Sequence, residues 1–326
     1  ITARRQDESG RSRFAVRRSL AALGYQETIN FSFVEERWER ELAGNADPIR
    51  LLNPIASPMS VMRSSLLGSL LQVLKFNLDR KAARVRVFEI GRVFLRDAAV
   101  ETSDTTVKGI HQPMRVAGLI YGDPDGLSWT HKDRRADFYD GKGDVEALLA
   151  PLRPVFEAAE HPAMHPGRCA RVLLDGQAIG FVGELHPRWR QQYDLPQAPV
   201  LFELALDAAL QRPVPVAQPV PRFQAVERDI AFTAAESVTF GALESVIRAA
   251  AARSGLLRGV QLFDVYRPQA GKGAEAGTGL ASEHKSLAVR LTLASEDTTL
   301  TDAQVEPLIA AVIEAAESQL GVKLRA

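Results

Sequence analysis

Residues Leu51 to Leu95 read LLNPIASPMSVMRSSLLGSLLQVLKFNLDRKAARVRVFEIGRVFL, and this stretch decides the fold. It opens as a loop punctuated by Pro54 and Pro58. Leucines at helical spacing then predict an amphipathic helix over Leu66–Asp79, with one buried stripe. That stripe comprises Leu66, Leu67, Leu70, Leu71, Leu74 and Leu78. Alternating apolar residues next predict a strand over Arg84–Leu95.

Further elements extend outward from this stretch on both sides. Helices are predicted over Phe14–Leu23, ended by Gly24, and over Gly143–Ala150. The other predicted strands are Glu27–Val34, Met114–Tyr121, Ala170–Leu174, Ala178–Glu184 and Val200–Leu206. Strands and helices mix without βαβ regularity, which predicts an α+β fold with helices packed against an antiparallel sheet.

A proline-rich segment, RPVPVAQPVP over Arg212–Pro221, predicts a semi-rigid linker between domains 1–211 and 222–326. After it the predicted order is strand, helix, strand, strand, helix, strand, as in a ferredoxin-like split βαβ domain. The predicted elements are Arg228–Thr233, Phe240–Ala252, Leu257–Tyr266, Lys285–Ala294, Asp302–Leu320 and Lys323–Arg325. Two helices on one face of this sheet should leave its other face free.

Composition narrows the class of protein. The 326 residues are 46% hydrophobic and 25% charged, with a formal net charge of zero, so any contact with RNA must be a local patch. No apolar run approaches the roughly 20 residues of a membrane span, and ITARRQDESG is unlike a signal peptide. The single cysteine, Cys169, is typical of a cytoplasmic protein. A chain that begins with Ile1 is expected to be a fragment of a longer one.

Nine motifs in a fixed order carry a family resemblance. They are SLAALGYQETINFSFV from Ser19, NPIASPMSVMRSSLLGSLL from Asn53, VFEIGRVFL from Val87, DFYDGKGDVEALL from Asp137, HPGRCARVLLDGQAIGFVGELHP from His165, LFELALDAAL from Leu201, ERDIAF from Glu227, and the pair VQLFDVYR and KSLAVRLTL. Together they resemble the C-terminal part of the bacterial phenylalanine–tRNA ligase β subunit. The resemblance implies a degenerate class II synthetase-like module over 1–211 and a ferredoxin-fold anticodon-binding domain over 222–326.

The resemblance also implies partners and a division of labour. The module is expected to assemble with a catalytic α subunit in an α2β2 heterotetramer that charges tRNA(Phe), using ATP and Mg²⁺ in α. Catalytic relatives bind phosphate with two arginines; here Arg92 lies near one place, but Glu203 and Asp207 stand at the other and would repel a triphosphate. This fragment is therefore expected to hold no catalytic residue or cofactor, and the family's upstream domains, editing included, are expected to be absent from it.

Two alternatives stay open at this point. One is an active class II adenylate-forming ligase, which ATP–pyrophosphate exchange would reveal. The other is a synthetase-like regulatory paralogue that binds protein only, which a tRNA-binding assay would distinguish.

Candidate binding residues follow from pattern. Residues 1–98 carry 17 Lys+Arg against 11 Asp+Glu, whereas residues 222–326 carry 11 against 13, so RNA contacts must come from chosen side chains. The tRNA-binding candidates are Arg290, Tyr266, Asp264, Arg228, Lys285, Arg222 and Arg267. Arg290 leads, because it interrupts an apolar strand and should point away from the core. The subunit-interface candidates are Phe31, Phe33, Leu66 and Leu70.

No metal site is predicted. His161 and His165 have metal-ligand spacing, but Pro162 and Pro166 disfavour a helix there and predict a loop. His186–Pro187 is interpreted as a turn. Asp140 and Asp144 are expected to serve the N-terminal turn of the helix that follows. The glycine-rich segment 269–286 lacks the Gly-Lys-Ser/Thr of a phosphate loop.

Overall fold

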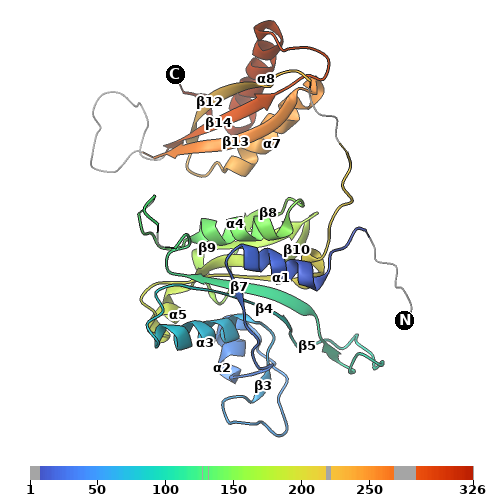
Figure 1. Ribbon diagram of the computed structural model, residues 1–326, viewed down its shortest axis with the longest axis vertical. Coiled ribbons are helices and arrows are strands. Elements are labelled where there is room, and N and C mark those ends of the chain that lie inside the picture. Colours follow the sequence, from blue (N-terminus) through green and yellow to red (C-terminus); the bar gives the residue numbers. More distant parts are fainter. Residues whose placement is uncertain (1–7, 127, 131, 218–221, 268–283, 326) are drawn as a thin grey trace. The chain divides into compact units, whose positions relative to one another are not determined.

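The computed structural model describes residues 8–126, 128–130, 132–217, 222–267 and 284–325 (Figure 1). The chain divides into two compact units, Ile1–Pro215 and Val216–Ala326, and the boundary falls within the predicted linker. Most of the glycine-rich segment, including Gly271, Gly273, Gly277 and Gly279, lies outside the described residues. No described helix combines the length and the apolar character needed to cross a membrane.

The first unit is built on a seven-stranded sheet with the order β1-β4-β7-β11-β10-β9-β8. The strands are β1 Gln26–Glu27, β4 Val85–Arg92, β7 Met114–Tyr121, β8 Val155–Ala158, β9 Met164–Leu174, β10 Gln177–Leu185 and β11 Val200–Ala205. Only the short edge strand β1 runs parallel to its neighbour β4; the other pairs are antiparallel. The α+β prediction with an antiparallel sheet is confirmed.

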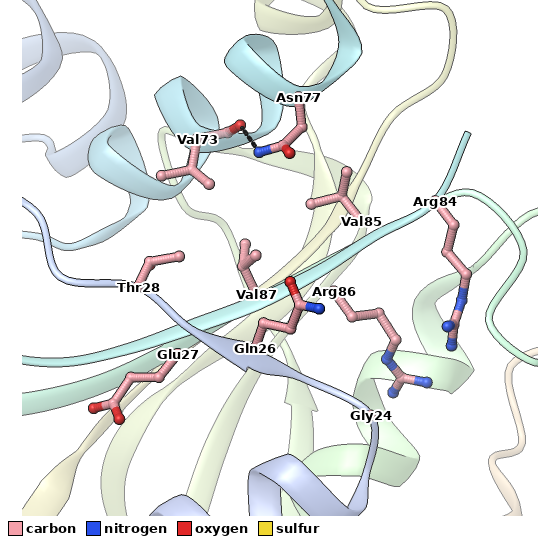
Figure 2. A pocket seen from close by; sticks show the side chains of 10 residues that line it. All are labelled: Gly24, Gln26, Glu27, Thr28, Val73, Asn77, Arg84, Val85, Arg86 and Val87. Atoms are coloured by element: carbon pink, nitrogen blue, oxygen red, sulfur yellow. Dashed lines mark hydrogen bonds between the residues drawn. The ribbon is translucent and has the colours of Figure 1, made fainter. Parts of the chain in front are cut away.

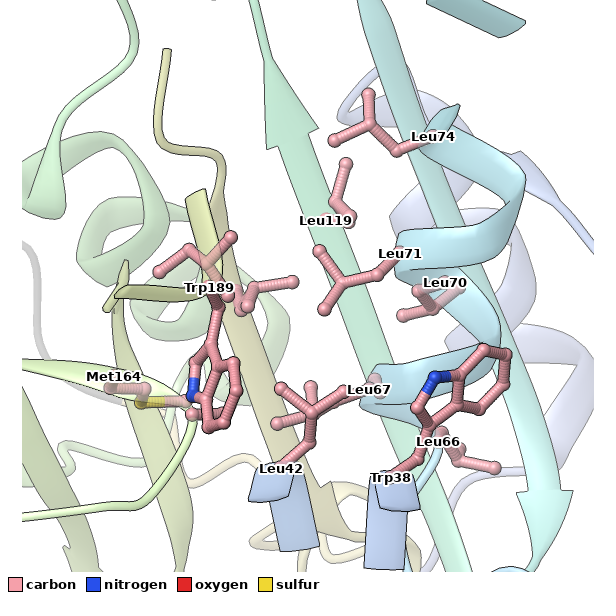
Figure 3. Close-up of a cluster of buried hydrophobic side chains, with 14 of the residues drawn as sticks. Trp38, Leu42, Leu66, Leu67, Leu70, Leu71, Leu74, Leu119, Met164 and Trp189 are labelled. Carbon is pink, nitrogen blue, oxygen red and sulfur yellow. The ribbon is translucent and has the colours of Figure 1, made fainter. Parts of the chain in front are cut away.

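Helices cover both faces of this sheet (Figure 1). On one face lies α3, Leu67–Leu78, whose leucine stripe packs with Trp38, Leu42, Met164 and Trp189 in one core cluster (Figure 3). On the other face lie α1, Arg13–Ala22, and α4, Phe138–Leu149, in a second cluster. Burial on both faces explains why the strands read as nearly continuous apolar runs.

Short elements complete the first unit. They are α2 Glu36–Trp38, the π-helical turn η1 Glu39–Ala43, the strand pairs β2 Phe33–Val34 with β3 Val61–Met62 and β5 Leu95–Arg96 with β6 Ile110–His111, α5 Pro187–Gln192, and α6 Leu206–Ala209.

The second unit has the predicted β-α-β-β-α-β order. Its elements are β12 Val226–Ala235, α7 Phe240–Ala251, the 3₁₀ turn η2 Ala252–Ser254, β13 Leu257–Tyr266, β14 His284–Leu293, α8 Asp302–Leu320 and β15 Lys323–Leu324. The sheet order is β13-β14-β12-β15, and every pair is antiparallel. Alternate residues of these strands, such as Phe232, Val289 and Leu291, join α7 and α8 in the core, and the residues between them face outward.

Three predicted elements differ in the structure. The single strand expected over Glu27–Val34 is two short strands, because the chain leaves the sheet edge after Thr28. The helix expected over Gly143–Ala150 begins five residues earlier, where Asp137 and Asp140 form a capping box. His186 is not a simple turn but the N-cap of α5, and its ring accepts from the Arg188 N–H.

Candidate functional site

The residues expected at a synthetase-like catalytic position do not come together. Arg92 ends β4 and is exposed, and its Nη1 donates to the Gln112 carbonyl at 3.1 Å. Strand alternation places Arg92 on the face of α1 and α4, whereas Glu203 of β11 lies on the face of α3. Asp207 is exposed on α6. The geometry is unlike a phosphate clamp, which needs several cations converging on one cleft.

Glu203 instead binds the start of α3. One of its oxygens accepts from the Ser65 hydroxyl at 2.6 Å and from the Leu66 N–H at 3.1 Å. The first N–H groups of a helix lack partners within it and carry partial positive charge, so a carboxylate is well placed there. Burial raises the pKa of Glu203 above its usual range.

Two more glutamates hold the same segment. Glu89 of β4 pairs with Arg63 at 2.7 Å, and each side chain is only 3% exposed. Glu39 of η1 accepts from the Ser64 N–H at 2.9 Å and from the Ser64 hydroxyl. Three carboxylates therefore fix residues 63–66 on the α3 face. The leucines of α3 pack in the core on the same face (Figure 3).

Among the described residues, no group of three His, Cys, Asp or Glu could hold a metal ion. The His161 ring packs against Phe181 in a tilted arrangement, with ring centroids 4.9 Å apart, and burial lowers the pKa of His161 to about 4. Its Nδ1 accepts from the Ala163 N–H, and that of His165 accepts from the Gly167 N–H.

The predicted role of Asp144 is wrong. Asp140 does serve the N-terminus of α4, as partner of Asp137 in the capping box. Asp144 lies within the helix, and there it accepts from the Tyr25 hydroxyl at 2.6 Å and pairs with Arg86 of β4. It thus ties α4 to the sheet rather than capping the helix, because the helix begins earlier than predicted.

Of the four interface candidates, Phe31 is the one that is largely exposed. It is 63% exposed, and its neighbour Ile29 is 92% exposed, whereas Phe33 is half-buried in β2. Leu66 and Leu70 are fully buried in the core of their own unit. The prediction that they present apolar surface is therefore wrong, because the α3 leucine stripe faces this chain's own sheet.

Hydrogen bonds to the residues beneath it hold the exposed segment around Phe31 in place. The Asn30 side chain donates to Glu89 at 2.7 Å, and the Arg63 N–H donates to the Ser32 carbonyl at 3.0 Å. The buried Arg63–Glu89 pair thus anchors the backbone on either side of Phe31. The alternation of apolar residues predicts a regular strand here and gives no indication of this anchor.

A hollow of about 290 Å³ lies beside the edge strand β1 (Figure 2). Val73 and Asn77 of α3 and Val85 and Val87 of β4 line it, together with Gln26 of β1. Arg84 and Arg86 also line it; Arg86 pairs with Asp144 of α4, and Arg84 donates to the Asp123 and Pro124 carbonyls (Figure 2). The hollow is an open groove at the sheet edge, and its lining is more polar than apolar.

In the second unit, the face of the sheet opposite α7 and α8 is called the outer face below. Strand register places Asp264 and Tyr266 of β13 and Arg290 of β14 on it, beside Asp229 of β12. Arg290 binds both Asp229 oxygens at 2.8 Å and lies 3.2 Å from Glu227. These carboxylates raise the pKa of Arg290 and keep its side chain paired.

The other four RNA candidates lie elsewhere. Lys285 is buried, and its Nζ donates to the Glu236 carbonyl at 2.7 Å. Arg267 binds the Glu236 carboxylate. Arg228 points to the helix side and pairs with Asp302 at 2.6 Å. Arg222 is exposed in a bend before β12. Lys285, Arg228 and Arg267, which the sequence analysis names as tRNA-binding candidates, are each paired within the protein.

Two residues of the outer face, Phe263 and Arg325, are not among the candidates predicted from the sequence. Phe263 is 50% exposed at an irregularity of register in β13, and Arg290 lies over its ring at 5.4 Å from the centroid. Arg325, just after β15, lies over the Tyr266 ring at 5.6 Å. Phe263 in VQLFDVYR could have suggested an exposed aromatic ring. Its direction depends on a β-bulge, however, and the position of a bulge cannot be found by counting alternate residues.

Comparisons with known proteins agree with this architecture. The family model for the phenylalanyl tRNA synthetase beta chain CLM domain matches residues 1–206, and the ferredoxin-fold anticodon binding domain matches residues 221–325.

Individual relatives give the same result. The phenylalanine–tRNA ligase beta subunit of Cupriavidus pinatubonensis is 48% identical over 98% of this chain and 39% of its own length. That of Ralstonia nicotianae is 50% identical, with the same two coverages of 98% and 39%. The chain thus spans about two fifths of the length of these curated relatives. A solved structure of Desulfitobacterium hafniense PylSc, a pyrrolysyl tRNA synthetase, matches weakly, with a TM-score of 0.41 and 11% identity over 59% of this chain and 66% of that one.

Proposed function

The chain belongs to the phenylalanine–tRNA ligase β-subunit family, and from this premise we propose that it binds the anticodon region of tRNA(Phe) and assembles with a catalytic α subunit. The whole enzyme would attach phenylalanine to tRNA(Phe) in an ATP-dependent reaction. The observation that carries the RNA-binding role is the outer face of the second unit. Its strands expose Phe263 and Tyr266 beside arginines, and no described helix covers them.

Anticodon bases are single-stranded and can be unstacked, and proteins read them by stacking and by hydrogen bonds to base edges. Phe263 and Tyr266 offer rings for stacking. Asp264 lies on the same strand and can accept a hydrogen bond from a base amino group. Such a surface suits a loop of RNA better than a duplex, whose bases are already stacked.

The first unit would supply the assembly role. Its edge strand β1 has no partner on its outer side among the described strands, and the apolar Ile29 and Phe31 follow directly after it. An open strand edge next to exposed apolar side chains is suited to contact with another subunit. We assign this edge to the α subunit, within an α2β2 heterotetramer.

Adenylate formation, with its ATP and Mg²⁺, would belong to the α subunit. The residues of this chain do not fit either group, because the buried Arg63 is neutralised by Glu89 and Glu203 is engaged by α3. The enzyme would act in the cytoplasm, which suits the unpaired, buried thiol of Cys169.

The test has two arms, one for each unit. In the first, the chain is titrated with tRNA(Phe) and with its anticodon stem–loop, and Tyr266→Ala is expected to weaken binding roughly 5- to 150-fold, the range for loss of one stacked base. Arg228→Gln is the matched control, since Arg228 faces the helices. In the second, the chain is mixed with an α subunit, and a stable complex competent in aminoacylation is expected. Failure of wild-type RNA binding would remove the first role, and absence of a complex would remove the second.

A further inference from the structure

The segment of residues 25–32 carries the exposed Ile29 and Phe31 and links β1 to β2. Its backbone pairs with the neighbouring strand β4 only as far as Thr28. Within the described chain, the backbone N–H groups of residues 29–31 have no hydrogen-bond partner. A segment with so few backbone bonds keeps one conformation only where other contacts restrict it, because ordering a free backbone costs conformational entropy.

A nearly buried ion pair fixes the start of this segment. Arg86 of β4 pairs with Asp144 of α4, and the two side chains are only 10% and 13% exposed. The buried Tyr25, directly before β1, donates its hydroxyl to the same Asp144 oxygen at 2.6 Å, and Arg86 lies over its ring at 4.6 Å from the centroid. One carboxylate therefore joins the start of the segment to both the sheet and α4.

A second buried ion pair fixes the end of the segment. Glu89 of β4 binds Arg63 through one oxygen at 2.7 Å and Asn30 through the other, also at 2.7 Å. The Arg63 N–H donates to the Ser32 carbonyl at 3.0 Å, and its Nη1 donates to the Phe31 carbonyl at 3.5 Å. The backbone on both sides of Phe31 is thus attached to an ion pair whose side chains are each 3% exposed.

The two ion pairs are better suited to positioning than to stabilising the fold. A buried ion pair seldom contributes more to stability than apolar side chains of the same volume, because both charges lose their water. Its hydrogen bonds, however, have a preferred distance and direction, so they favour one arrangement of the groups that they join. In this unit both ion pairs act on the two ends of a single exposed apolar segment.

We infer that the two buried ion pairs preorganise residues 25–32 for docking of the α subunit, and that Tyr25 and Asn30 are the positioning residues through which they act. This inference rests on the proposed function and adds the residues that order the docking segment. A loop that is ordered before it binds loses less conformational entropy on association, so its affinity is higher. Ile29 and Phe31 are held exposed in the free chain in the conformation that the partner meets.

The test removes each connection and leaves both ion pairs in place. Tyr25→Phe deletes the hydroxyl that is bonded to the first pair, and Asn30→Ala deletes the amide that is bonded to the second. Asn45→Ala is the matched control, because the Asn45 side chain makes the same kind of bond, at 2.8 Å, to the buried Glu39, outside the segment. Melting temperatures verify that each variant is folded.

Two measurements on the 326-residue chain are combined. In the free chain, NMR order parameters of the backbone amides of residues 26–31 are expected to be in the rigid range, about 0.85, and to fall toward about 0.6 in Tyr25→Phe and in Asn30→Ala. Calorimetric titration with an α subunit is expected to show roughly 10-fold weaker binding by each variant, the effect of ordering about one residue on association, with a less favourable entropy. Asn45→Ala should match the wild-type chain in both measurements.

Three results would overturn the inference. Order parameters that are low in the wild-type chain, or unchanged in both variants, would show that the ion pairs do not order the segment. Weaker α binding without a change in the order parameters would make the altered side chain a direct contact rather than a positioning residue. Greater mobility with unchanged affinity would place the docking site elsewhere. If the wild-type chain does not bind α at all, the proposed assembly role itself fails, and the docking claim fails with it.

Discussion

Glutamates at three positions explain why a synthetase-like sheet carries no phosphate clamp here. Glu39, Glu89 and Glu203 come from different elements and all bind residues 63–66. Of the three, only Glu89 forms an ion pair within this segment, with Arg63. Glu39 and Glu203 accept hydrogen bonds from N–H and O–H groups. Glu203, one of the two carboxylates that the sequence analysis expects to repel a triphosphate, is thus a structural acceptor, and its role depends on neighbours distant in the chain.

The first prediction concerns Glu203. Both of its hydrogen bonds go to one oxygen, and burial raises its pKa, so the protein gains little from its charge. Glu203→Gln keeps an acceptor oxygen and is expected to change the free energy of unfolding by less than about 1 kcal/mol. Glu203→Ala leaves the Leu66 N–H and the Ser65 hydroxyl without this acceptor and is expected to cost about 1–3 kcal/mol. Urea unfolding at neutral pH measures both; equal losses would show that the charge itself is needed.

His161 gives a prediction about pH. Burial lowers its pKa from 6.5 to about 4, so between these values the unfolded chain binds a proton that the folded chain does not. Stability is therefore expected to fall as the pH drops from about 6.5 to about 4, by at most roughly 3 kcal/mol for this group. His161→Asn retains an acceptor for the Ala163 N–H but does not titrate, and it should flatten this part of the profile. Denaturant unfolding across this range checks it; parallel profiles for the two proteins would contradict the assignment.

At the scale of elements, local pattern predicted most of the architecture. The α3 stripe, the strands β4, β7 and β11, and the full order of the second unit follow from periodicity that burial enforces. The apolar pattern gave a wrong prediction where a hydrogen bond between residues distant in the sequence determines the local structure. Alternation through Ile29, Phe31 and Phe33 predicted one strand, but Asn30 binds Glu89, 59 residues away, and the strand breaks.

The candidate site was predictable in outline only. The free sheet face and the outward direction of Arg290 follow from alternation and from the position of the helices. The pairing of Arg290 with Asp229 and of Lys285 with Glu236 requires strand register and turn geometry, which a single sequence does not give. For the same reason the contact of Arg325 with the Tyr266 ring could not be predicted.

A pair of substitutions distinguishes exposed from buried apolar residues in the first unit. Phe31→Asp should change the melting temperature little, because the side chain is 63% exposed, yet weaken association with an α subunit roughly 30-fold or more if Phe31 is a central contact. Leu70→Asp should instead unfold the unit, since it buries an unpaired charge.

Tyr139→Asp is the control for Phe31→Asp, because Tyr139 is also exposed but lies on α4. Calorimetry and size-exclusion chromatography give the two readouts. Unchanged α binding in Phe31→Asp would remove this edge from the interface.

At the scale of the whole chain, the two units have separate hydrophobic cores and different chemistry on their surfaces. The first has both faces of its sheet covered and an open edge; the second has one face covered and the other open. An open edge suits another protein, and an open face with exposed rings suits unstacked bases. This difference in sheet coverage gives a physical basis for the two roles proposed above, assembly for the first unit and RNA binding for the second.

The last prediction concerns catalysis by the whole chain. With Arg63 paired with Glu89, and with Glu203 engaged by the start of α3, the chain alone should not form phenylalanyl-adenylate. Phenylalanine-dependent ATP–pyrophosphate exchange is therefore expected to be absent from a preparation free of α subunit. Exchange should appear when α is added, and Arg290→Gln should leave its rate unchanged while tRNA binding weakens, because the two processes would use different subunits. Exchange by the isolated chain would contradict this assignment and make it an active ligase, in which the α3 segment must move aside to admit ATP.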